Sequence, residues 1–330
     1  MQRPQLVRTA LALACGLLLA APAQPAAASG TPYEETNSPG GSARCALPAG
    51  RTTLTLLSDG RERTVLVYLP RRSQGRGHLP TVLNLHGSQS TAAEQLDRSG
   101  LERTADREGF LVVAPQGALD AAPGYRWNVP YVTAPGGPDD ERFLDDTVDA
   151  LTRNGCTDAR KMYATGYSGG ARMVSQYACD RPDRLAAVAA VAGLRAGAPM
   201  QDADGTFAPD PDTCQPGRGV PVLSFSGTAD PVNPYHGGGA AYWGYGAEAA
   251  ERRWAALDGC RQAPRTTTVT AHVTRRTYGA CRGGDDVVSY VVDGGGHTWP
   301  GSTAEWPAAL GGVTQEIDAG RIMWDFFRRA

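Results

Sequence analysis

Ser168 stands in a pattern that can turn a serine hydroxyl into a nucleophile. Residues 161–174 read as a short apolar strand, then Gly166-Tyr167-Ser168-Gly169-Gly170, then a helix. In that context Gly-x-Ser-x-Gly predicts a sharp turn that exposes the serine hydroxyl, with small residues on both sides. The five residues alone are equally typical of a plain Gly/Ser loop. The hypothesis therefore depends on a base and an acid elsewhere in the chain.

His297 is the predicted base. It lies in Asp293-Gly294-Gly295-Gly296-His297-Thr298-Trp299-Pro300-Gly301, directly after an apolar strand, and the glycines let this loop approach other backbone closely. A nucleophilic serine needs a base to take its proton, and the base needs a third group that fixes its tautomer. His272 lies in a β-like run and His236 lies too close to the best acid, so both are weaker candidates.

Asp230 is the predicted acid. It follows an apolar strand, and functional groups of open α/β sheets collect where the strands end. The alternative acids stand in a Pro-rich loop with no strand before it: Asp202, Asp204, Asp210 and Asp212. The chain order Ser, Asp, His is the order that one large class of serine hydrolases uses.

Acyl transfer also needs donors for the developing oxyanion. The backbone N–H of Gly169 is one predicted donor. The second is expected in His86-Gly87-Ser88, after another apolar strand, with Ser88 N–H the first choice and Gly87 N–H the second. His86 is interpreted as a structural residue that shapes this turn.

The elements that must position these groups alternate between apolar strands and helices. Continuously apolar strands predict a doubly wound α/β fold with a mostly parallel sheet, and Asp59-Gly60 predicts an antiparallel hairpin before it. The expected strands are 53–57, 63–69, 81–85, 110–114, 162–165, 187–192, 220–225 and 287–292, and the expected helices are 92–107, 140–153, 171–179, 246–257 and 314–329.

The N-terminus has the features of an export signal. Residues 1–28 combine two arginines, a short apolar stretch and a run of alanines, which predicts a cleaved signal peptide and a secreted protein. The apolar stretch is too short to span a bilayer stably, and a lipidated Cys15 is the weaker alternative. Residues 29–44 are expected to form a flexible mature N-terminus, followed by a single catalytic domain over 45–330.

Six cysteines remain after the signal: Cys45, Cys156, Cys179, Cys214, Cys260 and Cys281. In an exported chain they predict a disulfide framework, for which 15 pairings are possible. We prefer Cys45–Cys156, Cys179–Cys214 and Cys260–Cys281. Metal binding is the competing interpretation, but the chain has no Cys-x-x-Cys pair and its five histidines are scattered.

Charge and composition exclude several function classes. A formal net charge of −2 with mixed signs gives no electrostatic reason to bind nucleic acid or an anionic membrane. The acidic residues near 139–146 are typical of a helix N-terminus rather than of a metal site. No glycine cluster has the spacing of a phosphate-binding loop, so no cofactor is expected. The protein is expected to be a monomer.

With these motifs in view, the chain resembles secreted α/β-hydrolase esterases, the group of feruloyl esterases, acetylxylan esterases and polyhydroxybutyrate depolymerases. The resemblance covers residues 52–329 and rests on four segments, Leu85-His86-Gly87, residues 164–170, residues 226–235 and residues 295–301. It implies an α/β-hydrolase fold and cofactor-free hydrolysis of carboxylic esters by Ser168, Asp230 and His297. Two positions depart from the family, because Gln89 replaces a common glycine and Gly169 replaces a larger residue such as Asn.

The substrate is expected to be an ester with an aromatic or sugar component. Trp127, Trp243 and Trp299 are the predicted substrate contacts, since they lie on loops near the functional edge of the sheet. They favour a feruloyl-type ester on plant cell-wall xylan. A polyester such as polyhydroxybutyrate, acyl transfer to an alcohol, and a non-catalytic carbohydrate-binding role remain as alternatives.

Overall fold

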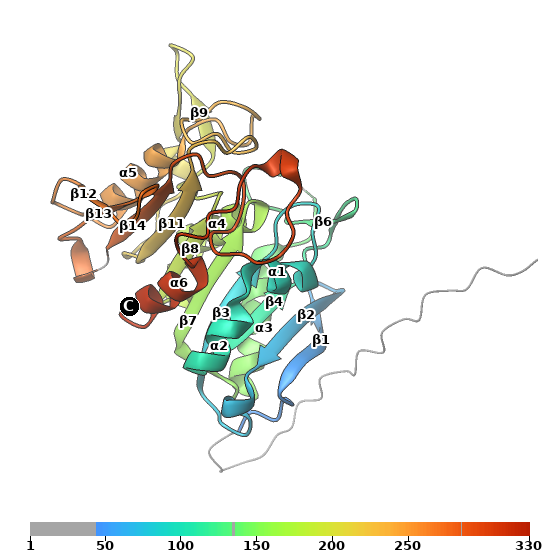
Figure 1. Cartoon of the computed structure of the whole chain (residues 1–330). Coiled ribbons are helices and arrows are strands. Elements are labelled where there is room, and N and C mark those ends of the chain that lie inside the picture. Colours follow the sequence, from blue (N-terminus) through green and yellow to red (C-terminus); the bar gives the residue numbers. More distant parts are fainter. Residues whose placement is uncertain (1–43, 134–135, 285) are drawn as a thin grey trace, which may run out of the picture. The chain divides into compact units, whose positions relative to one another are not determined.

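The computed structural model describes residues 44–133, 136–284 and 286–330 (Figure 1). The predicted signal peptide and all of the predicted flexible N-terminus except Arg44 lie outside the described residues. None of the helices in the described ranges is long and apolar enough to cross a membrane.

A ten-stranded sheet forms the centre of the described structure, in the order β1-β2-β4-β3-β7-β8-β11-β14-β13-β12. Its six central strands, from β4 to β14, are parallel, and antiparallel strands flank them on both sides. The strands are β1 Gly50–Ser58, β2 Arg61–Leu69, β3 Leu79–Leu85, β4 Leu111–Pro115, β7 Thr157–Tyr167, β8 Ala187–Val191, β11 Val222–Gly227, β12 Arg265–Thr268, β13 Val273–Tyr278 and β14 Val287–Val292. The doubly wound fold and the N-terminal hairpin are confirmed.

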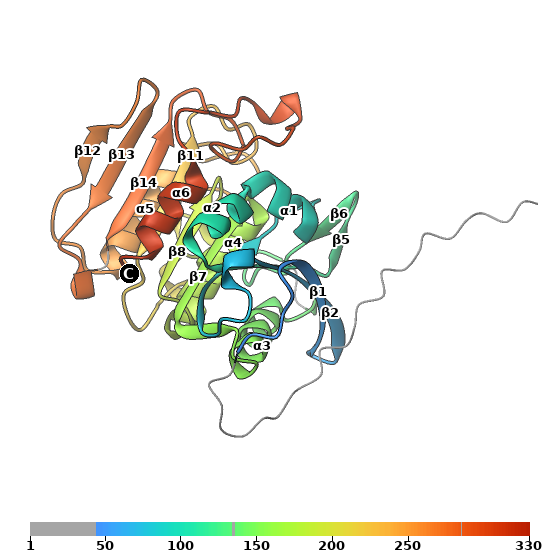
Figure 2. The same cartoon turned by 60° about the horizontal axis from the view of Figure 1, so that its bottom comes forward.

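Helices cover both faces of the sheet (Figures 1 and 2). One apolar core packs against α3, α4 and α5, and the other packs against α1, α2 and α6. The helices are α1 Ala92–Ser99, α2 Leu101–Glu108, α3 Asp140–Arg153, α4 Gly169–Asp180, α5 Ala247–Leu257 and α6 Ala319–Phe327. Strands β4 and β8 are buried along their whole length, as expected for parallel strands covered on both faces.

Two predicted helices need correction. The helix predicted at 92–107 is two helices, because Gly100 takes a left-handed conformation with φ 58° and ends α1. The last helix begins only at Ala319, where Asp318 caps it by accepting a hydrogen bond from Arg321 N–H. Two short pairs were not predicted at all, β5 Leu119–Ala121 with β6 Gly124–Arg126, and β9 Pro199–Gln201 with β10 Phe207–Pro209.

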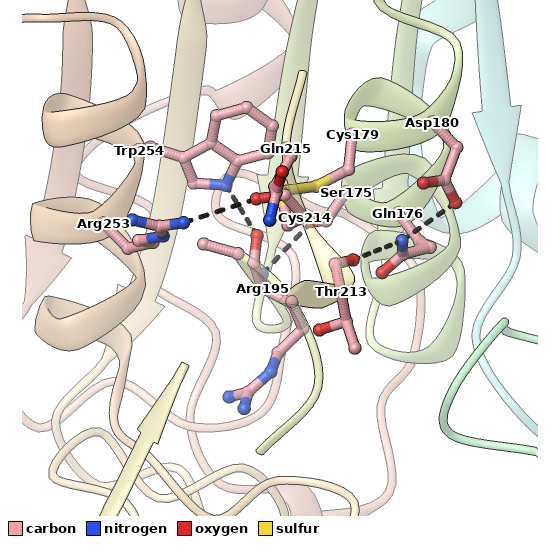
Figure 3. The surroundings of a disulfide bond; sticks show 12 residues. Ser175, Gln176, Cys179, Asp180, Arg195, Thr213, Cys214, Gln215, Arg253 and Trp254 are labelled. Atoms are coloured by element: carbon pink, nitrogen blue, oxygen red, sulfur yellow. Dashed lines mark hydrogen bonds between the residues drawn. A yellow bond between two sulfur atoms is a disulfide. The ribbon is translucent and has the colours of Figure 1, made fainter. Parts of the chain in front are cut away.

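The preferred disulfide set is confirmed. Cys45 bonds to Cys156, Cys179 to Cys214, and Cys260 to Cys281. Figure 3 shows the Cys179–Cys214 bond, which links the end of α4 covalently to the segment after β10. Gln176 Nε2 donates a hydrogen bond to Thr213 O in the same segment, at 2.9 Å. Natural disulfides typically stabilise a fold by about 2–4 kcal/mol, mainly by restricting the unfolded chain.

Candidate active site

Ser168 lies on the turn between β7 and α4, in a strained backbone conformation with φ 52° and ψ −111°. The turn is possible because its neighbours are glycines. A Cβ on Gly166 would lie 2.3 Å from the backbone of Gly170, and a Cβ on Gly170 would lie 2.4 Å from Leu85 O. Ser168 N–H donates to Val191 O at 2.9 Å, which fixes the turn to β8. The sequence thus folds locally into a nucleophile elbow.

His297 reaches this serine from the loop after β14. Its Nε2 lies 2.8 Å from Ser168 Oγ, and its Nδ1 lies 2.7 Å from Asp230 Oδ2. The Tyr167 hydroxyl donates to His297 O at 2.7 Å and helps to hold the loop. A Cβ on Gly227 would lie 2.2 Å from Gly295 O, so only glycine permits the close approach that the glycine-rich loop makes here.

Asp230 lies just beyond β11 and is itself held in place. Its Oδ1 accepts hydrogen bonds from the N–H groups of Val232 and Asn233, both at 2.8 Å, while Oδ2 faces His297. Asn233 Nδ2 donates to Ala192 O, which ties the segment to the end of β8. The structure therefore brings together the three predicted residues at the carboxyl ends of β7, β11 and β14, in a hydrogen-bonded chain.

The two weaker histidine candidates lie elsewhere. His272 is exposed and bonds to Glu316 in the turn before β13, and hydrogen bonding to that carboxylate raises the pKa of His272. His236 is exposed on a separate surface beside Gly237 and Tyr245.

The predicted oxyanion donors lie beside Ser168. Gly169 is the first residue of α4, where backbone N–H groups have no partner within the helix. Ser88 N lies 3.1 Å from the place that a Cβ on Gly169 would occupy, and Ser88 Oγ lies 2.5 Å from it. A Cβ on Gly87 would instead meet the Tyr167 ring at 2.7 Å. Ser88 N therefore lies beside Gly169, and Ser88 stays the first choice for the second donor.

His86 supports the turn that carries Ser88. It is fully buried, and burial lowers its pKa to about 4, so the ring is neutral at physiological pH. Its Nε2 accepts from Gly117 N–H at 2.9 Å, which leaves Nδ1–H to donate to Gly87 O at 2.8 Å. Gln89 follows with φ 63°, a conformation that favours glycine, which explains why a glycine suits this position in related sequences.

Comparison with known proteins places the chain in a family. A family model described as putative esterase matches residues 58–310. The chain belongs to this esterase family. It is 30% identical over 242 residues to feruloyl esterase B of Piromyces equi, covering 71% of this chain but only 42% of that protein. It is 29% identical over 304 residues to the putative esterase NocK of Nocardia uniformis subsp. tsuyamanensis, covering 84% of this chain and 83% of that one.

A solved structure shows the same fold. Acetyl xylan esterase from Aspergillus awamori superposes with a TM-score of 0.62 at 17% identity, covering 86% of this chain and 100% of that one. At that identity the likeness establishes the α/β-hydrolase fold alone.

A cavity of about 850 Å³ opens over Ser168 and His297 in this esterase. Trp127 is among the residues around it, but it is only 2% exposed, and its indole N–H donates to His86 O at 2.8 Å, so its ring packs mainly into the interior. The prediction that Trp243 and Trp299 contact substrate is wrong, because each is only 1% exposed and lies in the interior. Trp243 bonds to Pro234 O, and Trp299 belongs to the core that packs against α6.

Sequence reasoning missed the arginines of this cavity. Arg98, Arg126 and Arg172 line it. Arg172 follows Ser168 by four residues on α4, so its place beside the serine could have been read from helical spacing.

Proposed function

We propose that this chain is a secreted, monomeric serine carboxylesterase that acts through Ser168, His297 and Asp230. The observation that carries the proposal is the hydrogen-bonded chain from Asp230 Oδ2 through His297 to Ser168 Oγ, with distances of 2.7 and 2.8 Å. These lie within the range that proton transfer between a nucleophile and its base requires. Membership of the esterase family supports the same reaction.

In this mechanism Ser168 Oγ bonds to the ester carbonyl carbon as its proton passes to His297 Nε2. Asp230 Oδ2 accepts a hydrogen bond from His297 Nδ1–H and stabilises the imidazolium. The carbonyl oxygen, now an anion, accepts hydrogen bonds from Gly169 N–H and Ser88 N–H. The ester C–O bond breaks, His297 protonates the departing alcohol, and water then releases the acid from Ser168 by the same steps in reverse.

The proposed substrates are acyl esters of plant cell-wall polysaccharide, feruloyl esters first. Feruloyl esterase B supports this order, and acetylxylan esterase A of Aspergillus oryzae, 26% identical over 222 residues, supports an acetyl ester second. The cavity volume of about 850 Å³ suits an aromatic acyl group. Rates on methyl ferulate, acetylated xylan and polyhydroxybutyrate, measured side by side, test the order; a fastest reaction on the polyester would overturn it.

The test of the reaction itself uses p-nitrophenyl acetate. Ser168→Ala and His297→Ala should each lose activity by about 10⁴-fold or more, because the nucleophile and its base act as a unit. His236→Ala is the matched control, since it removes an exposed histidine outside the hydrogen-bonded chain. Equal rates for wild type and Ser168→Ala would refute the proposal and favour a non-catalytic role.

Secretion has its own test. Export from the producing cell and a mature N-terminus near Ser29, read by N-terminal sequencing, are the expected results. A cell-retained chain that keeps residues 1–28 would contradict the proposal.

A further inference from the structure

The cavity over Ser168 has an unbalanced charge. Three of its lining residues are arginines, and no aspartate or glutamate is among the described residues that line it. Arg98 forms a long ion pair with Glu94 on the same helix, with Arg98 Nη1 3.8 Å from Glu94 Oε2. Arg126 is exposed at the cavity wall. Like charges around a concave, partly desolvated site raise the local concentration of ligands of opposite charge. The lining therefore favours an anionic ligand.

Arg172 is the arginine nearest to the reacting groups. A Cβ on Gly169 would lie 3.5 Å from Arg172 Nη2 and 2.5 Å from Ser88 Oγ. The guanidinium and the Ser88 hydroxyl thus both border the space beside the oxyanion donors, where Gly169 provides no side chain. A larger residue at this position would fill the space that the guanidinium and hydroxyl face.

The charge of Arg172 has no anionic partner in the described structure. The residue is 7% exposed, and its Nε and Nη1 are buried without a hydrogen-bond acceptor. Its Cζ lies 4.3 Å from the centre of the Tyr242 ring, so an aromatic face supports one side of the guanidinium. Burial lowers the pKa of Arg172, while the charge interaction and hydrogen bond with the Tyr242 side chain oppose that change.

Arg195 is a second buried arginine, and its positive charge interacts with that of Arg172. It is 4% exposed, and its Nη1 donates to Tyr245 O at 2.9 Å while Nη2 is buried without an acceptor. Figure 3 shows its backbone held between Ser175 and Trp254, with the guanidinium directed away from the disulfide. Burial, with a further contribution from the charge of Arg172, lowers the pKa of Arg195 to about 10, so it stays charged at neutral pH.

We propose that Arg172, with the Ser88 hydroxyl, forms a subsite for a carboxylate carried by the ester substrate. The inference rests on the proposed esterase function and adds a preference to it: among esters that fit the cavity, those with a free carboxylate near the reacting carbonyl should react faster than neutral esters of the same size. A carboxylate in this space would accept a charge-assisted hydrogen bond from Arg172 Nη2, the guanidinium nitrogen that lies beside Gly169. It also offsets a charge that the fold itself leaves uncompensated.

The test compares neutral and charged esters of matched size. Monomethyl succinate against methyl levulinate places the charge on the acyl part, and acetoxyacetate against propyl acetate places it on the alcohol part. Wild type should show a kcat/KM at least about tenfold higher for the charged member of one pair, as expected for a charge-assisted hydrogen bond. Equal rates within both pairs would overturn the subsite.

The variants then assign the preference to Arg172. Arg172→Met should reduce the ratio of kcat/KM for the charged ester to kcat/KM for its neutral partner to about one, and Arg172→Lys should restore part of that ratio. Arg160→Met is the control, because Arg160 is exposed and pairs with Asp158. If Arg172→Met keeps the preference, or loses the neutral ester equally, Arg172 is not a carboxylate subsite.

A binding measurement separates this inference from the esterase proposal. Succinate should bind the Ser168→Ala protein in calorimetry, and binding should weaken at least about tenfold when Arg172→Met is added. This result supports the subsite even if p-nitrophenyl acetate shows no turnover, which is the failure of the esterase proposal alone. Equal binding with and without Arg172 would overturn the subsite even in an active esterase.

Discussion

Arg63 and Arg172 are both buried arginines that stack on an aromatic ring, but only one of them meets a carboxylate. Arg63 is 3% exposed, and its Cζ lies 3.8 Å from the centre of the Phe143 ring. Its Nη2 lies 2.6 Å from Asp140 Oδ1, at the start of α3. Arg172 is also buried and stacks on the Tyr242 ring, but it meets no carboxylate among the described residues. The first charge is neutralised inside the fold, and the second remains available for a ligand.

The difference has a physical consequence for each site. A charge moved out of water loses several kcal/mol of solvation, and a partner must offset that loss. At Arg63 the partner is permanent, and Asp140 also accepts from Asn128 N–H at 2.7 Å, so the pair connects β2, α3 and the loop before α3. At Arg172 the Tyr242 side chain offsets part of the loss, but among the described residues no carboxylate neutralises the charge. Stability and ligand binding are thus served by the same residue type in different surroundings.

The largest expected effect is on Arg63. Arg63→Met should lower the free energy of unfolding by about 3–5 kcal/mol, because it leaves the Asp140 carboxylate buried without its cation. Burial already raises the pKa of Asp140, and the charge of Arg63 opposes that rise. Denaturant unfolding at pH 7 measures the loss, and the folded fraction should keep its rate on p-nitrophenyl acetate.

The double variant Arg63→Met, Asp140→Asn is the control for this explanation. It removes both charges and keeps an acceptor for Asn128 N–H, so it should recover part of the lost stability. A double variant that is less stable than Arg63→Met would show that packing, rather than charge, accounts for the effect.

The same change at Arg172 should act in the opposite direction. Arg172→Met removes a buried charge that has no partner, so the free energy of unfolding should stay the same or rise, by up to about 1–2 kcal/mol. Saturating succinate should raise the melting temperature of wild type but not of the variant. A loss of stability as large as that of Arg63→Met would contradict the contrast between the two sites.

The sequence specified the hydrogen-bonded chain better than it specified the cavity. Ser168, Asp230 and His297 each follow an apolar strand, and parallel strands bring such positions to one edge. Trp243 and Trp299 also lie on loops, but loops in this protein fold back into the core, which no local pattern records. Whether a tryptophan on a loop faces substrate or the interior depends on tertiary packing.

The lack of an anionic partner for Arg172 could not be predicted from the sequence either. The four-residue spacing between Ser168 and Arg172 can be read from the sequence. The lack of a carboxylate beside Arg172 among the described residues depends on how the chain folds. In the same way, the left-handed conformation of Gly100 divides one continuous amphipathic pattern into α1 and α2. Position along an element can be predicted from sequence, whereas the surroundings of a side chain require the fold.

In a third cluster two acidic side chains lie together without a dedicated cation. Burial, and then the neighbouring Asp180 carboxylate, raises the pKa of Glu141 to about 8, while Arg181 opposes the rise. The folded protein therefore keeps a proton on Glu141 that the unfolded chain releases near the ordinary glutamate pKa of 4.5. This contribution to stability is fully present below pH 4.5 and is lost as the pH rises through about 8.

Glu141→Gln should remove this dependence, since its amide stays neutral at every pH. Relative to wild type, the variant should gain melting temperature as the pH rises from 5 to 9, because wild type loses the stabilisation by the Glu141 proton over that range. Glu62→Gln is the matched control, because Glu62 is an exposed glutamate on β2, and it should show no such gain. If wild type and Glu141→Gln melt in parallel from pH 5 to pH 9, Glu141 and Asp180 do not share a proton, and the contrast between balanced and unbalanced charges is limited to the arginines.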